Sequence, residues 1–372
     1  MKRCVFFLLC LLLLLPCLCI ADEEGQNNIY ILLNEQGQIL THYAGVPAEG
    51  DEYISGDNRH FSIDRVDHDQ KQAHARSLGD FSLPDVSWLS EDAHAVSAPR
   101  RAVAMYCTHS DESYKPTDGV SSDEQRGGIY DVAEEFKRAL EKQGITVYYS
   151  DETHHPHDAG AYRRSRATAA SLIEEGVDAV MDIHRDGIPD PESYESEIKG
   201  QDATMVRLLV GRSNQNAAVN KEFAAQIKAV ADKLYPGLIK DIYMGKGSYN
   251  QDLMGKAILL EFGTFTNPKE DVLSSAGYMA DVINRTLYGG VSGAAGSKTS
   301  AGAASAKTSA QEDTKAFSSA AWLILLFVIG AILFAFIASG RGGDTMSKFK
   351  RTFQEMGGGL LGGKKKDGSD EK

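Results

Sequence analysis

The chain has 372 residues and carries 52 Asp and Glu against 39 Lys and Arg, which gives a formal net charge of −13 at pH 7. This negative net charge argues against a nucleic-acid partner. Any binding to an anionic polymer has to rely on local, short-range contacts. Four of the five cysteines lie within residues 1–21. If that segment is removed, only Cys107 remains, so no intrachain disulfide can form and stability must come from a packed core.

Residues 1–21 have the pattern of a secretory signal peptide. A basic start is followed by an apolar run from Val5 to Leu15, and Cys19-Ile-Ala21 is a small-x-Ala cleavage pattern ahead of acidic residues. We therefore expect export, with cleavage at the end of this segment.

Residues 22–98 are predicted to form a small β-rich domain. Strand-like runs are separated by turn residues, with Gly37 in the first turn, which is typical of a small antiparallel sheet or barrel. The runs are Ile29–Leu33, Gln38–Thr41, Gly50–Ile54 and His60–Val66. No catalytic set is evident among them, so a supporting, orienting or recruiting role stays open.

Residues 99–290 alternate between strand and helix patterns. The predicted strands are 102–106, 145–149, 179–183, 205–210 and 257–260. The predicted helices are 129–143, 162–175, 216–234 and 267–287. In the first helix, Val132, Phe136 and Leu140 recur at a spacing of four, which indicates one buried face. The alternation predicts an α/β fold, a three-layer α/β/α sandwich. The sequence has no Gly-rich phosphate loop before any of these helices, which argues against nucleotide chemistry.

The C-terminal part is predicted to tether this domain to a membrane. Residues 291–315 have the Ala, Ser and Gly content of a flexible linker, and 316–340 form an uncharged, mostly apolar stretch long enough for a transmembrane helix. The basic tail, 341–372, is expected on the cytoplasmic side. With a cleaved signal peptide, this predicts a single-pass protein of the cell membrane whose catalytic domain faces outward.

Three polar strings each lie at the end of one of the predicted strands, namely Tyr106–Tyr114, Asp182–Asp186 and Leu259–Gly263. An open α/β sheet collects its chemistry beyond the carboxyl ends of its strands, so these strings are expected to meet at one rim. Together they supply two histidines and several carboxylates. A hydrolytic zinc needs three such ligands, an open position for water and a further carboxylate that moves protons. The sequence therefore predicts a zinc hydrolase.

Further motifs accompany these strings, namely Gly50-Asp-Glu-Tyr-Ile54, Tyr162-Arg-Arg-Ser-Arg166, Val210-Gly211, Tyr249-Asn-Gln-Asp-Leu253 and Glu261-Phe-Gly263. In this order, the motifs resemble those of the stage II sporulation protein P family, zinc-dependent N-acetylmuramoyl-L-alanine amidases. The resemblance implies that His109 and His184 are zinc ligands and that Glu261 is the catalytic carboxylate. It also implies peptidoglycan as substrate, a role in sporulation-associated wall remodelling during engulfment, and a lytic transglycosylase and other engulfment-complex membrane proteins as partners.

The third zinc ligand has two candidates. Glu112 completes a His-x-x-Glu pair with His109, a spacing seen in zinc carboxypeptidases, and Glu124 lies where the broader cell-wall amidases place their glutamate. We favour Glu112. The family usually has His-Thr-His in this string, whereas this chain has Cys107-Thr-His109. Cys107 is interpreted as a buried structural cysteine rather than a ligand.

Substrate contacts are expected from three further residues. Arg166 and Arg185 are candidates for binding the stem-peptide carboxylates, because a guanidinium group forms paired hydrogen bonds with them. Asn250 is a candidate for a hydrogen bond to an amide or a sugar. The segment Asp151–Asp158 is rich in histidine and carboxylate groups, and we favour a substrate contact or a solvated loop over a metal site there.

The expected reaction is hydrolysis of the amide between N-acetylmuramic acid and L-alanine. His109, Glu112 and His184 would hold Zn²⁺, and Glu261 would move the protons. One alternative is a zinc metallocarboxypeptidase that acts on peptide termini. The other is a non-catalytic, membrane-anchored wall-binding protein.

Overall fold

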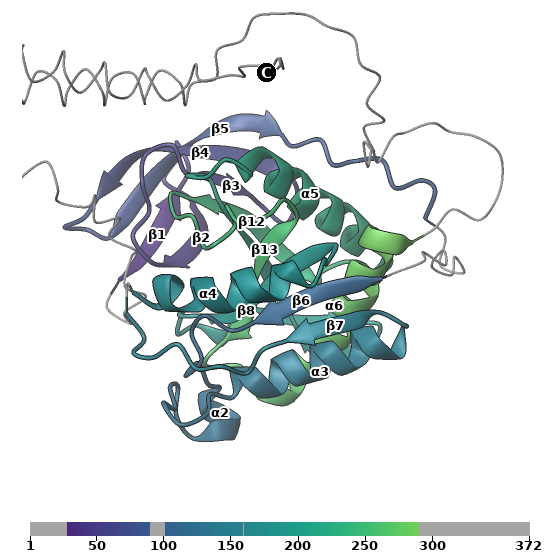
Figure 1. The fold of residues 1–372 in the computed structure, drawn as a ribbon. Coiled ribbons are helices and arrows are strands. Elements are labelled where there is room, and N and C mark those ends of the chain that lie inside the picture. The colour runs from purple at the N-terminus through teal and green to yellow at the C-terminus, as the bar shows by residue number, and fades with distance from the viewer. Residues whose placement is uncertain (1–27, 90–100, 159, 290–372) are drawn as a thin grey trace, which may run out of the picture. The chain divides into compact units, whose positions relative to one another are not determined.

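The computed structural model describes residues 28–89, 101–158 and 160–289. Eleven strands form one mixed sheet in the order β2-β1-β5-β4-β3-β12-β11-β13-β8-β6-β7 (Figure 1). The N-terminal strands are β1 (Ile29–Leu33), β2 (Ile39–Ala44), β3 (Glu52–Ile54), β4 (Arg59–Asp67) and β5 (Gln72–Asp80). The others are β6 (Ala102–Tyr106), β7 (Thr146–Tyr149), β8 (Ala179–Asp186), β11 (Val206–Gly211), β12 (Ile239–Gly245) and β13 (Ala257–Thr264). A separate hairpin consists of β9 (Glu195–Ile198) and β10 (Gln201–Thr204).

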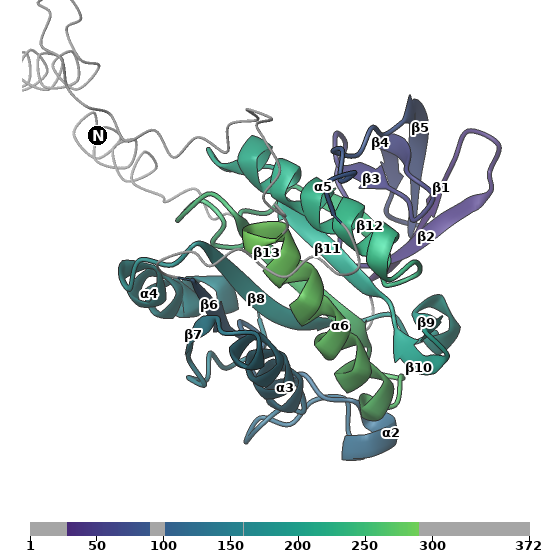
Figure 2. The same ribbon diagram turned by 90° about the vertical axis from the view of Figure 1, so that its right-hand side faces the viewer.

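The helices lie on both faces of the sheet. They are α2 (Lys115–Asp118), α3 (Ile129–Lys142), α4 (Ala161–Glu174), α5 (Ala217–Leu234) and α6 (Lys269–Tyr288). Helices α3, α5 and α6 pack over one face, as Figure 2 shows, and α4 packs on the other face against β6. The predicted α/β fold is thus confirmed, and each helix predicted in 99–290 begins and ends within two residues of its expected bounds.

Helix α3 illustrates how the sequence sets this packing. The residues predicted to share a face, Val132, Phe136 and Leu140, are all fully buried. Burial of each large apolar side chain contributes about 1.5–3 kcal/mol. Gly144 follows the helix with a φ of +77°, a conformation in which other residues are strained, so the chain turns there into β7.

The N-terminal strands extend the central sheet. Strand β3 pairs antiparallel with β12, so that Ile54 lies opposite Ile242, and the ring of Tyr43 stacks on that of Tyr243 with 4.0 Å between centroids. The predicted β-rich part is therefore present, but within residues 28–89 its strands belong to the same sheet as the strands of 101–289. The described residues, from 28 to 289, belong to one compact unit.

Several predicted segments lie outside the described residues. These are the signal peptide, the linker, the transmembrane stretch and the basic tail. Among the described residues, no helix is both long and apolar enough to span a membrane.

The direction of the strands decides where the polar strings meet. Strands β6, β8 and β13 are parallel neighbours, so their carboxyl ends lie at one edge of the sheet. Strand β11 runs antiparallel to β13 and therefore brings its first residues to that same edge. The predicted meeting of the three strings follows from this arrangement.

Candidate metal centre

The first polar string is fixed to the sheet by Asp182. The backbone N–H of Thr108 donates to one carboxylate oxygen of Asp182 at 2.8 Å, and the Thr108 hydroxyl donates to the other at 2.6 Å. Further on, the buried Tyr114 hydroxyl donates to the carbonyl of Phe262 on β13 at 2.9 Å. The loop between Thr108 and Tyr114 is thus held across β8 and β13 at both of its ends.

Glu112 lies between two histidines at the centre of this site. Its Oε1 is 3.3 Å from Nδ1 of His109 and 3.3 Å from Nδ1 of His184. The three side chains are buried, with exposed fractions of 0%, 3% and 1%. The second oxygen, Oε2, accepts the backbone N–H of Arg185 at 2.9 Å. The other candidate ligand, Glu124, is exposed and lies outside this group.

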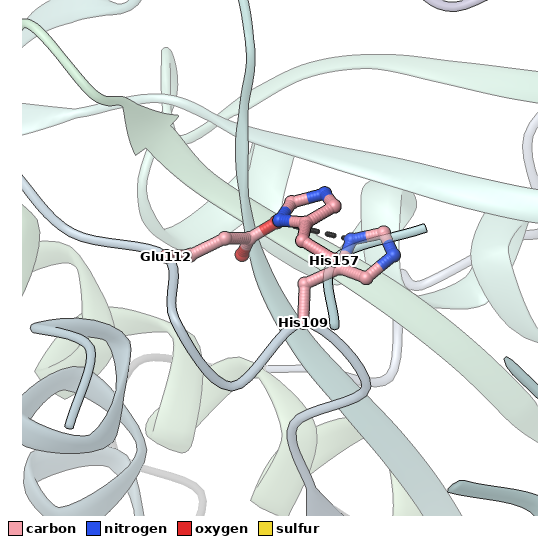
Figure 3. Close-up of side chains that lie close together, drawn as sticks. All are labelled: His109, Glu112 and His157. Atoms are coloured by element: carbon pink, nitrogen blue, oxygen red, sulfur yellow. Dashed lines mark hydrogen bonds and ion pairs between the residues drawn. The ribbon is translucent and has the colours of Figure 1, made fainter. Parts of the chain in front are cut away.

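A third histidine, His157, joins the site from the loop before α4. Its ring stacks on that of His109 with 3.9 Å between centroids. His109, Glu112 and His157 each offer a ligand atom within 4.8 Å of the others, and Figure 3 shows their side chains converging. The sequence prediction did not include His157 in the site. Three histidines within residues 154–157 could have pointed to it in the sequence. Only the folded loop shows which of them faces the strand ends.

The charges of this cluster depend on one another. Burial alone would lower the pKa of His184, but the carboxylates of Asp182 and Glu112 raise it well above its usual value. Burial alone would raise the pKa of Glu112, yet His184, His109 and Arg185 hold it well below its usual value. At neutral pH the centre therefore pairs a buried carboxylate with a buried imidazolium, which places a positive charge where a metal ion would lie.

The donor set fits Zn²⁺. Two imidazoles and one carboxylate are a common ligand set of catalytic zinc. Nε2 of His184 lies 3.0 Å from Asp182 Oδ1, and a carboxylate behind a ligating histidine fixes its orientation. Cys107 is fully buried in the hydrophobic core, and burial raises the pKa of its thiol well above the usual value. That placement is the one expected of a structural cysteine.

Glu261 lies beside this group on the neighbouring strand. It is paired in register with His184 across β13 and β8, so both side chains point to the same face of the sheet. Its Oε2 accepts the hydroxyl of Tyr194 at 3.4 Å and lies 3.8 Å from the guanidinium of Arg207. The carboxylate is buried, with an exposed fraction of 3%.

Arg207 organises the surroundings of Glu261. It is fully buried and makes two hydrogen bonds to Asp241, at 2.7 and 3.0 Å, and one to Asp186 at 2.9 Å. It also donates to the hydroxyl of Thr41 on β2 at 2.9 Å, so the N-terminal strands reach the surroundings of the predicted catalytic carboxylate. Arg207 was not among the residues predicted for the site. In the sequence, Arg207 could have been recognised as a charged residue inside the apolar run of the strand predicted at 205–210.

Removal of the Arg207 charge is expected to destabilise the fold strongly. Arg207→Met leaves Asp241 and Asp186 buried without their cation, which costs about 3–5 kcal/mol of unfolding free energy. Urea denaturation measures this cost. Arg59→Met is the matched control, because Arg59 pairs with Asp57 in solvent and an exposed pair contributes about 0–1 kcal/mol. Equal, small losses in both variants would contradict a buried network around Glu261.

Two of the three predicted substrate contacts, Arg166 and Asn250, make hydrogen bonds within the chain. Arg166 forms paired hydrogen bonds with Asp252 at 2.8 and 2.6 Å, and its side chain is 45% exposed. Asn250 is buried and donates to the carbonyl of Tyr162 and to the hydroxyl of Ser165. Neither arrangement tests a contact with substrate, which stays a prediction.

The third predicted substrate contact, Arg185, is engaged with backbone carbonyls. Its guanidinium donates to the backbone carbonyls of Ser113, Asp186 and Ser121. Through its hydrogen bond to Ser113, Arg185 helps to fix the loop that carries Glu112. Its predicted contact with a stem-peptide carboxylate also stays a prediction.

Comparison with known proteins identifies the family. The family model described as stage II sporulation protein P (SpoIIP) matches residues 35–284. The chain belongs to this family. Stage II sporulation protein P of Bacillus subtilis (strain 168) is 28% identical over 284 residues, which covers 71% of this chain and 67% of that SpoIIP protein. The resemblance inferred from the motifs is confirmed.

Two solved structures are also similar. An N-acetylmuramoyl-L-alanine amidase from Clostridium difficile 630 is 17% identical, with a TM-score of 0.33, and covers 51% of this chain and 96% of its own. The CwlD amidase from Clostridioides difficile, solved in complex with the GerS lipoprotein, is 12% identical, with a TM-score of 0.36, and covers 50% and 96%. These TM-scores are too low to carry an inference about this chain.

Proposed function

We propose that this SpoIIP-family protein is a zinc-dependent N-acetylmuramoyl-L-alanine amidase. The observation that carries the proposal is the buried Glu112 carboxylate, 3.3 Å from both His109 and His184 at the carboxyl ends of the strands, with Glu261 in register beside His184. Membership of the SpoIIP family supports the same reading. The substrate in this proposal is the amide bond between N-acetylmuramic acid and L-alanine in peptidoglycan.

Each residue of the proposed site has a separate role in the hydrolysis. His109, Glu112 and His184 would hold the ion, and Asp182 orients the His184 ring. When bound, zinc supplies a Lewis acid and lowers the pKa of water. Glu261 accepts the proton of the attacking water and delivers it to the leaving L-alanine nitrogen. Arg207 and Tyr194 hold the Glu261 carboxylate in place for both transfers.

The cellular setting is part of the same proposal. We propose export by the signal peptide at 1–21, anchoring by the apolar stretch at 316–340, and action on the wall outside the membrane during engulfment. A lytic transglycosylase that cuts the glycan strand would complement removal of the stem peptide. The net acidic composition supports short-range recognition of the substrate rather than attraction at a distance.

Mass analysis of purified sacculi after digestion tests the reaction. The amidase releases intact stem peptides that begin with a free L-alanine amine and leaves glycan with unsubstituted lactyl groups. Release of a single amino acid with the lactyl bond intact would instead indicate the carboxypeptidase. Binding to sacculi without any new product would indicate the wall-binding protein.

Zinc binding is expected to release a proton from His184. Because the pKa of His184 is raised well above its usual value, the metal-free site holds this proton at neutral pH, and zinc must displace it. The apparent affinity should therefore rise about tenfold per pH unit through neutral pH and level off above the pKa of His184. Calorimetry in buffers of different ionisation enthalpy measures the proton count. A pH-independent affinity with no proton released would contradict this account of His184.

A further inference from the structure

His157 belongs to the group of side chains whose ligand atoms converge. Among the residues that the structure describes, His109, Glu112 and His157 form the group that could hold an ion, with one ligand atom of each within 4.8 Å of the others (Figure 3). The ring of His157 stacks on that of His109 at 3.9 Å between centroids. His184 lies 3.3 Å from Oε1 of the same Glu112. A fourth protein ligand is therefore available beside the three of the proposed site.

Asp111 holds the His157 ring in the way that carboxylates hold zinc-ligating histidines. Nδ1 of His157 lies 3.1 Å from Oδ1 of Asp111 and 3.2 Å from Oδ2. A histidine that binds a metal commonly donates its other ring N–H to a carboxylate. Asp182 has the same relation to His184, whose Nε2 is 3.0 Å from Oδ1. With Nδ1 on Asp111, the His157 ring offers Nε2 to an ion, and that atom is buried.

The number of protein ligands decides what a bound His157 does. Hydrolytic zinc keeps three protein ligands and one position for water, whereas four protein ligands close the site. His109, Glu112 and His184 are at most 3% exposed, while the His157 side chain is 20% exposed and comes from the loop before α4. Of the four side chains, His157 is thus the one that can move into solvent with the least loss of packing.

We propose that His157 is a fourth zinc ligand of the substrate-free protein, that Asp111 is its positioning residue, and that the site opens for water when His157 leaves the ion. This inference rests on the proposed function, because it needs the ion at His109, Glu112 and His184. It adds a resting state in which the ion is held but closed to water.

The zinc affinity of the full-length protein, measured by competition with a chelator, tests the ligand. Asp111→Asn should lower the affinity about 10–100-fold, the usual effect of losing a carboxylate behind a ligating histidine, and His157→Ala should lower it at least as much. X-ray absorption of the zinc-loaded proteins should show three imidazole ligands in wild type and two in His157→Ala. His155→Ala is the matched control, because His155 lies in the same loop but outside the converging group, and it should match wild type in both measurements.

The closed state has a test of its own. Azide binds an open metal position, and its binding to the Co²⁺-loaded protein is read from the visible spectrum. His157→Ala should bind azide about tenfold more tightly than wild type, because His157 occupies that position most of the time in wild type. Unchanged zinc affinity and imidazole count in His157→Ala would overturn the proposal, as would equal azide binding by the two proteins. If wild type binds no zinc, the proposed function itself fails, and this inference fails with it.

Discussion

Glu112→Gln is expected to abolish both zinc binding and activity. The substitution keeps the shape of the side chain but removes the Glu112 carboxylate, which lies 3.3 Å from both His109 and His184. A neutral amide neither balances the charge of Zn²⁺ nor offers a comparable ligand atom, so a large loss in affinity follows. Zinc content by mass spectrometry should fall below about one tenth per chain, and amidase turnover should fall by about 10³-fold or more.

Glu124→Gln is the matched control for this experiment. It makes the same chemical change twelve residues later, at an exposed side chain outside the cluster. It should therefore retain zinc and activity. The opposite result, with zinc lost only from Glu124→Gln, would show that the ligand set has been assigned wrongly. Circular dichroism and thermal unfolding establish that Glu112→Gln is folded, since its amide oxygen can still accept the backbone N–H of Arg185.

Glu261→Gln is expected to separate metal binding from catalysis. The carboxylate is on the strand next to His184 and is held by Arg207 and Tyr194, outside the group of ligand atoms around Glu112. Its zinc content should therefore match that of wild type. Turnover should fall by about 10²–10⁴-fold, the range for loss of a general acid–base group, because an amide cannot accept the proton of water.

The control for Glu261→Gln is the same change at Glu174, an exposed residue of α4. That variant should behave as wild type in both measurements. If Glu261→Gln loses zinc in proportion to activity, Glu261 is a ligand and the proposed proton transfer is wrong. If it retains both, another group takes the proton.

The sequence predicted that His109, Glu112 and His184 lie close together, because strand ends are local features, while their role as metal ligands stays a prediction. His109, Glu112 and His184 lie at the ends of apolar runs, and the parallel neighbours β6, β8 and β13 bring such ends together. The periodicity of α3 likewise encodes its buried face. These patterns need only the residues within one element.

The parts that were missed depend on contacts between distant segments. Strand β12 contains Lys240 and Asp241, which obscure its apolar pattern, yet Asp241 is the buried partner of Arg207. The pairing of β3 with β12 joins the N-terminal strands to the sheet, and no local pattern specifies which strand pairs with which. His157 was missed for the same reason, because the path of its loop depends on the fold around it.

Digestion of sacculi in water enriched in ¹⁸O tests the central claim most directly, since it identifies the carbonyl to which water adds. The amidase mechanism predicts one ¹⁸O atom in the lactyl carboxylate of muramic acid and none in the released stem peptide, with no incorporation by Glu261→Gln. Label in a peptide carboxylate, with the bond between muramic acid and L-alanine intact, would contradict it.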